Sequence, residues 1–552
     1  MKRLLQPRLF SILMLLAAVA VVAMMSAPRG VGGTASTPKS SQLKRQNARS
    51  QWVYLDDQGH LAYKTVLRGD KIMDFSFAGY GGGGMAIPWV PVCQTVSPSG
   101  GDDGDAIQAA INAVSQRQLV GGFRGAVLLA PGVFHCKEPL VIKDSGVVLR
   151  GSGAANDPHN NTIIQMTGKP HLCISIAGSS TMRTVGNPTL IADAYVPAGS
   201  TAFRVADASS FKAGDTVLIN HPVTPAWVHF MGMDHLVRNG KPQTWISGSI
   251  STERTIGRIT GNMITLDIPL SDCLDARYLN PPGSSVIKCD NTGQISQVGV
   301  ENLKIVAPAQ VVSINQPQHH ALHIQGVTDA WVRNIAIVDT INSVSLSSDT
   351  RRITVDNVQT SHSVATVGAA KPADFATNGT QTLFNHCSST GNNLFYFVTG
   401  ARVTGPNVLL NCTFRGNGHI QPHQRWATGL LVDGCRVSES GIDFMNRGEM
   451  GSGHGWTIGW SVAWNCLARS YVIQQPPGAA NWAIGCQGTP ETDVMPFGDK
   501  TKAPRLPEGI FDSHGTPVMP PSLYLAQLRE RLGEQALKNI GYASRVGNSR
   551  SH

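Results

Sequence analysis

The chain has 552 residues, of which only 15% are charged and 41% are hydrophobic, and it contains 58 Gly and 32 Pro. A disordered chain would carry fewer apolar residues, so this composition excludes general disorder and indicates tight-turned all-β structure. The formal net charge of +9 favours attraction to a polyanion, although a soluble basic protein without such a partner is the alternative.

The N-terminus has a basic start followed by an apolar run from Leu9 to Met25, which is the pattern of a secretory signal. We therefore expect a signal peptide at 1–27, a disordered linker at 28–50, and a secreted or periplasmic protein. After cleavage no stable membrane association is expected. Because the apolar run is close to the lower length limit for a membrane span, an uncleaved anchor is the alternative.

Residues 51–194 predict an N-terminal cap followed by the first coils of a stacked fold. Asp105 is expected to cap a short helix with an apolar face, and the strand-like runs RGAVLLAPGVFHC, EPLVIKDSGVVLRGSG and TIIQM follow with Gly turns. A helix at this place would cover the open end of a stack, where backbone groups would otherwise lack partners.

Residues 195–290 interrupt this strand pattern and are expected to form a small β insertion. Gly214-Asp215 marks a tight turn between two strand-like runs, and Trp227 and Trp245 lie in the segment that follows. These rings belong either to a core or to platforms on which the apolar face of a sugar stacks.

Residues 291–490 are expected to form the main coils, because one short strand-like phrase returns there every 23–32 residues. Its copies are GVENLKIV, WVRNIAIV, ITVDNVQT, TLFNHCSST, VLLNCTF, LVDGCRV and VAWNCLA. Such a period without intervening helices predicts a parallel β-solenoid, in which each coil pairs with the next. The repeated Asn can form a hydrogen-bonded ladder, and the longer repeats must leave the stack as loops.

Four cysteines, Cys387, Cys412, Cys435 and Cys466, each follow the ladder position by one residue and should stack coil upon coil. They form either a column of small buried side chains or one or two disulfides between adjacent coils.

Residues 491–552 begin as a Pro-rich segment and then predict a C-terminal amphipathic helix that covers the end or the side of the solenoid. Ser522 is its expected N-cap, and Leu525, Leu528, Leu532 and Ala536 lie on one stripe.

Three phrases near the start resemble the opening of the pectate-lyase-like (pectin lyase fold) superfamily. They are Asp-Gly-Asp-Ala-Ile-Gln-Ala-Ala-Ile, then Ala-Pro-Gly-Val-Phe, then Val-Val-Leu-Arg-Gly-Ser-Gly. With the later coils, the resemblance covers roughly residues 70–190 and 290–490. It implies an all-β, right-handed parallel β-helix. The superfamily includes polysaccharide lyases, polygalacturonase-type hydrolases, epimerases and phage tailspikes, so the fold leaves the reaction open.

A second strand, aligned through the ladder positions, gathers polar residues on adjacent coils. His423 and Arg425 lie on one coil, Asn446 and Arg447 on the next, and the loop EMGSGHGW adds His454. This set suits β-elimination on a uronate polymer, which needs a base, a cation on the substrate carboxylate and an acid for the leaving oxygen.

We assign His423 or His454 as the base and both arginines to the carboxylate, which a guanidinium binds in a bidentate manner. Asn446 is an expected orienting donor and Tyr396 a possible acid. The expected sugar platforms are Trp456, Trp227 and Trp245.

Two other functions stay open. A polygalacturonase-type glycoside hydrolase needs paired carboxyl groups; Gly453-His454-Gly455 resembles its Gly-His-Gly, but the Asp-Asp pair expected upstream is missing and only Asp433 and Asp443 remain. The other is a non-catalytic polysaccharide-binding or adhesin solenoid, which would use the Trp platforms without turnover.

No cofactor and no metal are expected. Asp374, Glu439, Asp443 and Glu449 are too dispersed to name a calcium site, and His319-His320 with His323 is a weak metal pattern on a strand. Because Lys and Arg form no dense run with interleaved aromatic residues, an acidic polysaccharide is favoured as partner over nucleic acid. We expect a monomer.

Overall fold

The computed structural model describes residues 48–492 and 506–542. The expected signal peptide at 1–27 lies outside the described residues, as do residues 28–47 of the expected linker. Strand β1 (Ala48–Arg49) pairs in parallel with β41 (Val518–Met519), so regular structure begins inside the segment expected to be disordered. No helix of the described residues is long and apolar enough to cross a membrane.

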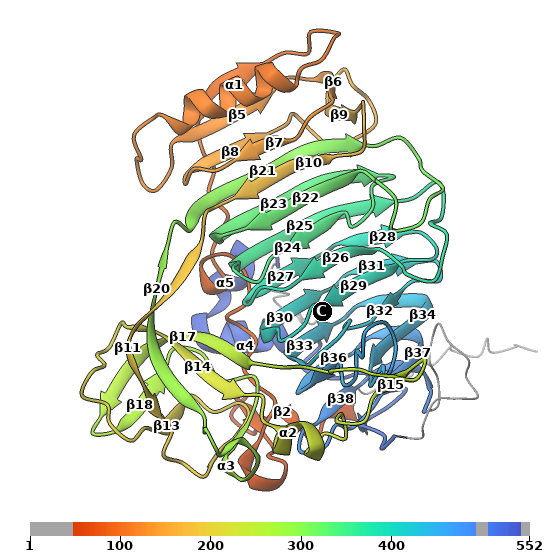
Figure 1. The fold of residues 1–552 in the computed structure, drawn as a ribbon. Helices are drawn as coiled ribbons and strands as arrows, with labels where there is room; N and C mark the ends of the chain where they lie inside the picture. Colours follow the sequence, from red (N-terminus) through yellow and green to blue (C-terminus); the bar gives the residue numbers. More distant parts are fainter. Residues whose placement is uncertain (1–47, 493–505, 543–552) are drawn as a thin grey trace, which may run out of the picture. The chain divides into compact units, whose positions relative to one another are not determined.

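Most of the described chain winds into coils whose strands build three parallel faces (Figure 1). The first face consists of β4 (Val92–Val96), β5 (Gly125–Leu129), β8 (Val147–Arg150), β21 (Ile295–Val306), β23 (Val327–Val338), β25 (Arg351–Ser361), β27 (Thr382–Asn385), β30 (Thr404–Leu410), β33 (Ala427–Asp433), β36 (Ser461–Trp464), β38 (Asn481–Ile484) and β40 (Ile510–Asp512). The short β35 (Ile458–Gly459) also pairs with β33.

The second face continues from the first through β21, β23 and β25. It also contains β6 (Gly132–Cys136), β9 (Thr162–Met166), β28 (Ser388–Thr390), β31 (Thr413–Arg415), β34 (Arg436–Phe444), β37 (Leu467–Ile473) and β39 (Gln487–Pro490).

The third face, which carries the site described below, continues into β34 and β37. Its other strands are β7 (Leu140–Ile142), β10 (Leu172–Ala177), β22 (His320–Gln325), β24 (Val344–Leu346), β26 (Ala373–Thr377), β29 (Phe395–Thr399) and β32 (His419–Ile420). The right-handed parallel β-helix expected from the sequence is confirmed.

The repeated Asn marks the bend between the first and second faces. Asn302, Asn334 and Asn357 have φ of 58°, 53° and 50°, a left-handed conformation that Asn tolerates better than most residues. Nδ2 of Asn334 donates to Oδ1 of Asn302 at 3.0 Å, and Nδ2 of Asn357 donates to Oδ1 of Asn334 at 2.9 Å. The expected ladder is therefore present, and the same residue type serves both the bend and the stacking.

The cysteines beside the ladder line the interior as free thiols. Cys387, Cys412, Cys435 and Cys466 are buried, and the Sγ of Cys412 lies 3.4 Å from the carbonyl oxygen of Phe384 on the preceding coil. The column of small buried side chains is confirmed, and no disulfide links the described cysteines.

Helix α1 (Gly104–Ser115) packs against β4, β5 and β7 at one end of the coils (Figure 1). Its buried face carries Ile107, Ile111 and Val114, as expected. The N-cap position is Asp103, not Asp105, and the Asp103 carboxylate accepts from the backbone of Ser99 and of His135 in β6 instead of capping the helix.

The β insertion is wider than expected, because β11 (Thr181–Leu190) pairs with β20 (Ser285–Thr292). An antiparallel sheet in the order β11-β20-β14-β17-β18-β13 forms its body. The remaining bounds are β12 (Tyr195–Val196), β13 (Ala202–Arg204), β14 (Thr216–Pro222), α2 (Pro225–Phe230), β15 (Val237–Arg238), β16 (Lys241–Pro242), β17 (Ser249–Thr260), β18 (Met263–Leu266), β19 (Leu274–Asp275) and α3 (Ala276–Leu279). The hairpin β15–β16 reaches the coil that contains Gly451, to whose carbonyl Arg238 donates at 2.5 Å.

Two C-terminal helices, α4 (Leu523–Leu532) and α5 (Glu534–Asn539), replace the single helix expected, because Gly533 with φ of 78° separates them. Ser522 is the N-cap of α4, as expected, and its side chain accepts from the backbone of Leu525. Ser522 also donates to Asp433 of β33 at 2.7 Å, so the helices cover the outer side of the first face. The other N-terminal elements are β2 (Val53–Leu55), β3 (Leu61–Tyr63), and the 3-10 turns Leu67–Gly69 and Tyr80–Gly82.

Candidate functional site

The outward side chains of the third face form a groove of about 480 Å³. The strand register aligns its floor from coil to coil: His323 lies beside Ser345, Ser345 beside Ala376, and Ala376 beside Val398. His423, just after β32, closes the far end. Because parallel strands stack about 4.8 Å apart, a groove from β10 to the coil of His423 extends about 24 Å along the stack.

The described lining of the groove has basic side chains and no acidic ones. Lys371, His320, His323 and His423 line it, and none of the described lining residues is an Asp or a Glu. The middle of the groove is apolar, with Phe395 as its largest side chain. A groove of this composition accepts an anionic ligand more readily than a cationic one.

Three of the residues predicted as catalytic meet at the end of this groove, where His423 lines it and Arg447 and His454, 5% and 8% exposed, lie beside His423. The rings of His423 and His454 lie 4.7 Å apart, and Nη1 of Arg447 lies 3.2 Å from Nδ1 and 3.0 Å from the carbonyl oxygen of His423. Because a guanidinium has donors only, Nδ1 of a neutral His423 accepts and the ring proton lies on Nε2. His423 therefore offers a donor at Nε2.

Electrostatics keeps both rings neutral near pH 7. Burial, followed by the charges of Arg447 and Arg425, lowers the pKa of His423 to about 4. Burial and then the charges of Arg447, His423, Arg425 and Arg238 lower the pKa of His454 to about 3. Burial lowers the pKa of Arg447 to about 10, which leaves it charged. The end of the groove thus combines arginine cations with uncharged imidazoles.

Arg425 and Asn446 have structural partners instead of the substrate contacts expected for them. Arg425 donates through Nε to the carbonyl of Trp245 at 2.6 Å and through Nη2 to the carbonyl of Ser452 at 2.8 Å. Asn446 accepts from the backbone of Gly448 at 2.7 Å and is buried. Arg425 adds positive charge to the site, but its donors are used by the protein and it is not placed to bind a substrate carboxylate.

The three predicted sugar platforms are not on the surface. Trp227, Trp245 and Trp456 are 6%, 1% and 2% exposed. Trp227 stacks on Trp245 at 5.1 Å, and Nε1 of Trp245 donates to the carbonyl of Trp456 at 3.2 Å. The platform interpretation is wrong, and these rings fix the insertion to the coils.

The predicted acid Tyr396 is also not at the surface, since it is fully buried and stacks on Phe414 at 5.0 Å. The register shifts at this point, where Phe395 lies beside His419 and Phe397 beside Ile420. Because Phe395 lines the groove, its neighbour Tyr396 points to the other side of β29, into the core, and is not available as an acid.

Sequence reasoning missed the other half of the groove. His320, His323 and Lys371 line this half. The sequence pattern of His319, His320 and His323 suggested only a weak metal site. Nδ1 of His320 lies 2.6 Å from the carbonyl oxygen of Ile341 and therefore donates, so that Nε2 of the neutral ring carries no proton. The available signal was the strand HALHIQ, in which two of the polar positions are histidines. In the described part of the chain, no group of three His, Cys, Asp or Glu is arranged to hold a metal ion.

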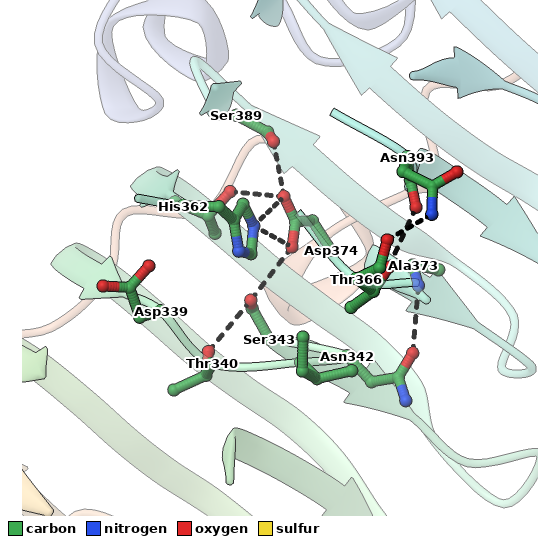
Figure 2. A network of polar contacts seen from close by, with 12 residues as sticks. Asp339, Thr340, Asn342, Ser343, His362, Thr366, Ala373, Asp374, Ser389 and Asn393 are labelled. Carbon is green, nitrogen blue, oxygen red and sulfur yellow. Dashed lines mark hydrogen bonds and ion pairs between the residues drawn. The ribbon is translucent and has the colours of Figure 1, made fainter. Parts of the chain in front are cut away.

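Two buried carboxylates lie behind the groove and accept hydrogen bonds from protein donors. Asp374 accepts from Ser343 at 3.0 Å, from Thr360 at 2.7 Å and from Ser389, and both its oxygens lie within 3.0 Å of Nε2 of His362 (Figure 2). This network joins the second and third faces from the inside.

The second carboxylate is Asp443 on the coil of Arg447. It accepts from His419 at 2.7 Å and from Gln421 at 2.9 Å, and it is fully buried. Neither Asp374 nor Asp443 lines the groove.

Comparison with solved structures finds remote likenesses. The tailspike protein gp49 from Pseudomonas phage LKA1 is 14% identical over 71% of this chain and 56% of its own, with a TM-score of 0.40, so this chain spans about half the length of that protein. The Azotobacter vinelandii mannuronan C-5 epimerase AlgE6 A-module is 12% identical over 70% of both chains, with a TM-score of 0.32. An iota-carrageenase complexed to iota-carrageenan fragments is 11% identical over 72% of this chain and 58% of its own, with a TM-score of 0.27.

No protein-family model and no curated protein matches the sequence. At these identities and TM-scores the structural likenesses carry no argument about the reaction, which has to be inferred from the geometry of the site itself.

Proposed function

We propose that this protein binds an acidic, uronate-containing polysaccharide in the groove of the third face and cleaves it by β-elimination. The observation that carries the proposal is the composition of the groove lining, which contains Lys371 and three histidines and, among its described residues, no Asp or Glu. The charge of Lys371, with those of Arg447 and Arg425 at the end of the groove, attracts a polyanion, and the neutral imidazoles are available for proton transfer. In this proposal the protein acts outside the cytoplasm as a monomer.

The roles at the end of the groove follow from the tautomer of His423. Its Nε2–H is the proton donor to the leaving oxygen as the C–O bond breaks, because Nδ1 is occupied by Arg447. The proton that His454 takes from the substrate then restores this N–H, since the two rings lie 4.7 Å apart, so both imidazoles end the step neutral. A neutral His454 has one unprotonated ring nitrogen and takes the proton α to the carboxylate. The Arg447 guanidinium stabilises the charge that develops on the carboxylate.

Binding of the uronate also increases the basicity of His454. The charges of Arg447, Arg425 and Arg238 all lower its pKa in the free protein. A substrate carboxylate beside them offsets this effect and raises the pKa of the base as the complex forms.

Hydrolysis of the polygalacturonase type is less well supported than elimination. It requires two carboxyl groups on either side of the scissile bond. Asp374 and Asp443 lie near the third face, but both are buried, accept hydrogen bonds from protein donors and do not line the groove.

Incubation of the protein with polygalacturonate, alginate and glucuronan, followed by ultraviolet absorbance and reducing-end assays, tests the proposal. Elimination gives a new carbon–carbon double bond that absorbs in the ultraviolet for every new reducing end. New reducing ends without absorbance would indicate a hydrolase. Binding without either signal would indicate a non-catalytic polysaccharide-binding protein.

The pH dependence of kcat/KM is a further prediction. This profile reports the pKa of groups in the free protein, so the acid limb should fall near pH 4 or below, where His423 and His454 become protonated. An unperturbed histidine would place the limb near pH 6.5. The measurement is kcat/KM between about pH 3 and 8, and an acid limb at 6.5 would contradict the assignment.

Two glycines in the loop after Arg447, Gly448 and Gly451, allow a test in which the His454 ring is displaced but the residue itself is not substituted. A Cβ at Gly451, whose φ is 60°, would lie 2.3 Å from Cε1 of His454, whereas a Cβ at Gly448, with φ of 49°, meets nothing within 4 Å. Both Gly→Ala changes cost about 1–2 kcal/mol of backbone strain. Gly451→Ala should also lower kcat/KM about 10²-fold, since small displacements of catalytic groups have effects of this size.

The matched variant Gly448→Ala carries the same type of strain and should keep native kcat/KM. Equal losses in both variants, measured on folded protein, would mean that the position of His454 does not matter.

A further inference from the structure

A second cavity, of about 570 Å³, lies away from the groove and shares no lining residue with it. It lies between the N-terminal segment, the insertion and the last coils. Its wall is strongly aromatic, with contributions from Trp52, Trp227, Trp426, Trp460, Tyr195 and Tyr278. Cavities of this size hold a small organic ligand.

Two carboxylates face this aromatic cavity. Asp272 accepts from Nε1 of Trp426 at 2.6 Å and from Nε1 of Trp460 at 3.0 Å, and it is 8% exposed. Asp70 accepts from the Tyr195 hydroxyl at 2.6 and 2.7 Å and from the backbone of Ala198 at 2.8 Å, and it is 2% exposed. Every one of these donors is electrically neutral.

The two arginines that line the cavity already have a carboxylate partner there. Arg68 and Arg277 both pair with Asp275, a third carboxylate that lines the cavity. His221 also lines the cavity, but burial lowers its pKa to about 4 and its Nδ1 has no hydrogen-bond partner among the described residues. In the described part of the chain, neither Asp70 nor Asp272 forms an ion pair with Lys, Arg or His.

Asp70 and Asp272 thus lack a positive charge from the described protein, and a bound cation would supply it. A buried carboxylate is costly without a counter-charge, and burial raises the pKa of Asp272 to about 6 and also raises that of Asp70. Each carboxylate oxygen can accept two hydrogen bonds, so both groups can still accept from a ligand. Indole faces attract a cation as well, most strongly where water is excluded, whereas the rings of Tyr195 and Tyr278 already have Arg68 and Arg277 over them, at 3.5 and 5.2 Å.

We propose that this cavity is a binding site for a small organic ammonium compound, whose cation lies between Asp70, Asp272 and the aromatic rings and whose apolar body fills the remaining volume. This site is independent of the polysaccharide groove, and its test does not use the polymer.

The test compares choline with 3,3-dimethylbutan-1-ol, which has the same shape and no charge, on the full-length protein. Binding is followed by calorimetry and by tryptophan emission, because four indoles line the wall. Choline should bind at least about tenfold more tightly than the neutral alcohol and should change the emission. Equal affinities, or no heat and no emission change with choline, would overturn the proposal.

Asp70→Asn tests the charge at constant shape. Its amide oxygen can still accept from the Tyr195 hydroxyl, which lies within reach of both carboxylate oxygens. Choline affinity should fall about tenfold while affinity for the alcohol stays the same. Unchanged choline affinity in the folded variant would overturn the proposal, and if the variant does not fold, the two ligands on the native protein still decide it.

Discussion

His423→Gln is expected to lower kcat on a uronate polymer about 10²–10⁴-fold, which is the usual contribution of a general acid or base. Glutamine preserves the hydrogen bonds of the neutral ring: its amide oxygen can accept from Arg447, as Nδ1 does at 3.2 Å, and its amide nitrogen can donate into the groove. It has no titratable proton. The substitution therefore separates proton transfer from positioning.

A second groove histidine provides the matched variant. His323 is held by Ser345 at 2.8 Å and Ser347 at 3.2 Å at the other end of the groove. Because it lies several coils from His423, His323→Gln should raise KM and leave kcat near the native value. A His423→Gln protein that keeps native kcat would remove His423 from the chemistry, and an equal loss of kcat in both variants would place the reaction elsewhere.

Asp374→Asn is expected to have the largest effect on stability, lowering the free energy of unfolding by about 3–5 kcal/mol, as when one partner of a buried ion pair is removed. The side chains of His362 and Asp374 are 5% and 2% exposed, and Ser343, Thr360 and Ser389 also donate to the carboxylate. Denaturant unfolding of the two proteins measures the difference.

The loss should depend on pH. Burial by itself would disfavour both charges, but the interaction between the two groups outweighs it. His362 and its neighbours lower the pKa of Asp374, and Asp374 raises the pKa of His362. The Asp374 contribution is present above its unfolded value of 3.8 and is lost as pH falls through the folded pKa. The His362 contribution is present below 6.5 and is lost as pH rises through the folded pKa.

The difference between native and Asp374→Asn protein should therefore be greatest between about pH 4 and 6.5. The exposed pair of His229 and Asp234, with its atoms only 2.6 Å apart, is the control. Asp234→Asn should not change the unfolding curve measurably, because water screens an exposed pair. Similar losses in the two variants would mean that burial is not the source of the effect.

The sequence by itself determined the coil and its period. Asn302, Asn334 and Asn357 identify the bend because tolerance of a left-handed conformation belongs to the residue itself. Ser522 likewise identifies the start of α4 through a contact three residues away. The register of successive coils was enough to bring His423 and Arg447 together, since stacked strands repeat their spacing.

Tertiary structure alone decided which of these side chains can meet a ligand. The carbonyl of Trp245 engages Arg425 across 180 residues, and Trp245 contacts Trp456 across 211 residues, so residues that look free in sequence are buried by the insertion. Tyr396, a predicted acid, is a core side chain because its neighbour Phe395 faces the groove. Conformational preference acts over a few neighbouring residues, whereas exposure depends on everything that packs nearby, and here the packing comes from distant parts of the chain.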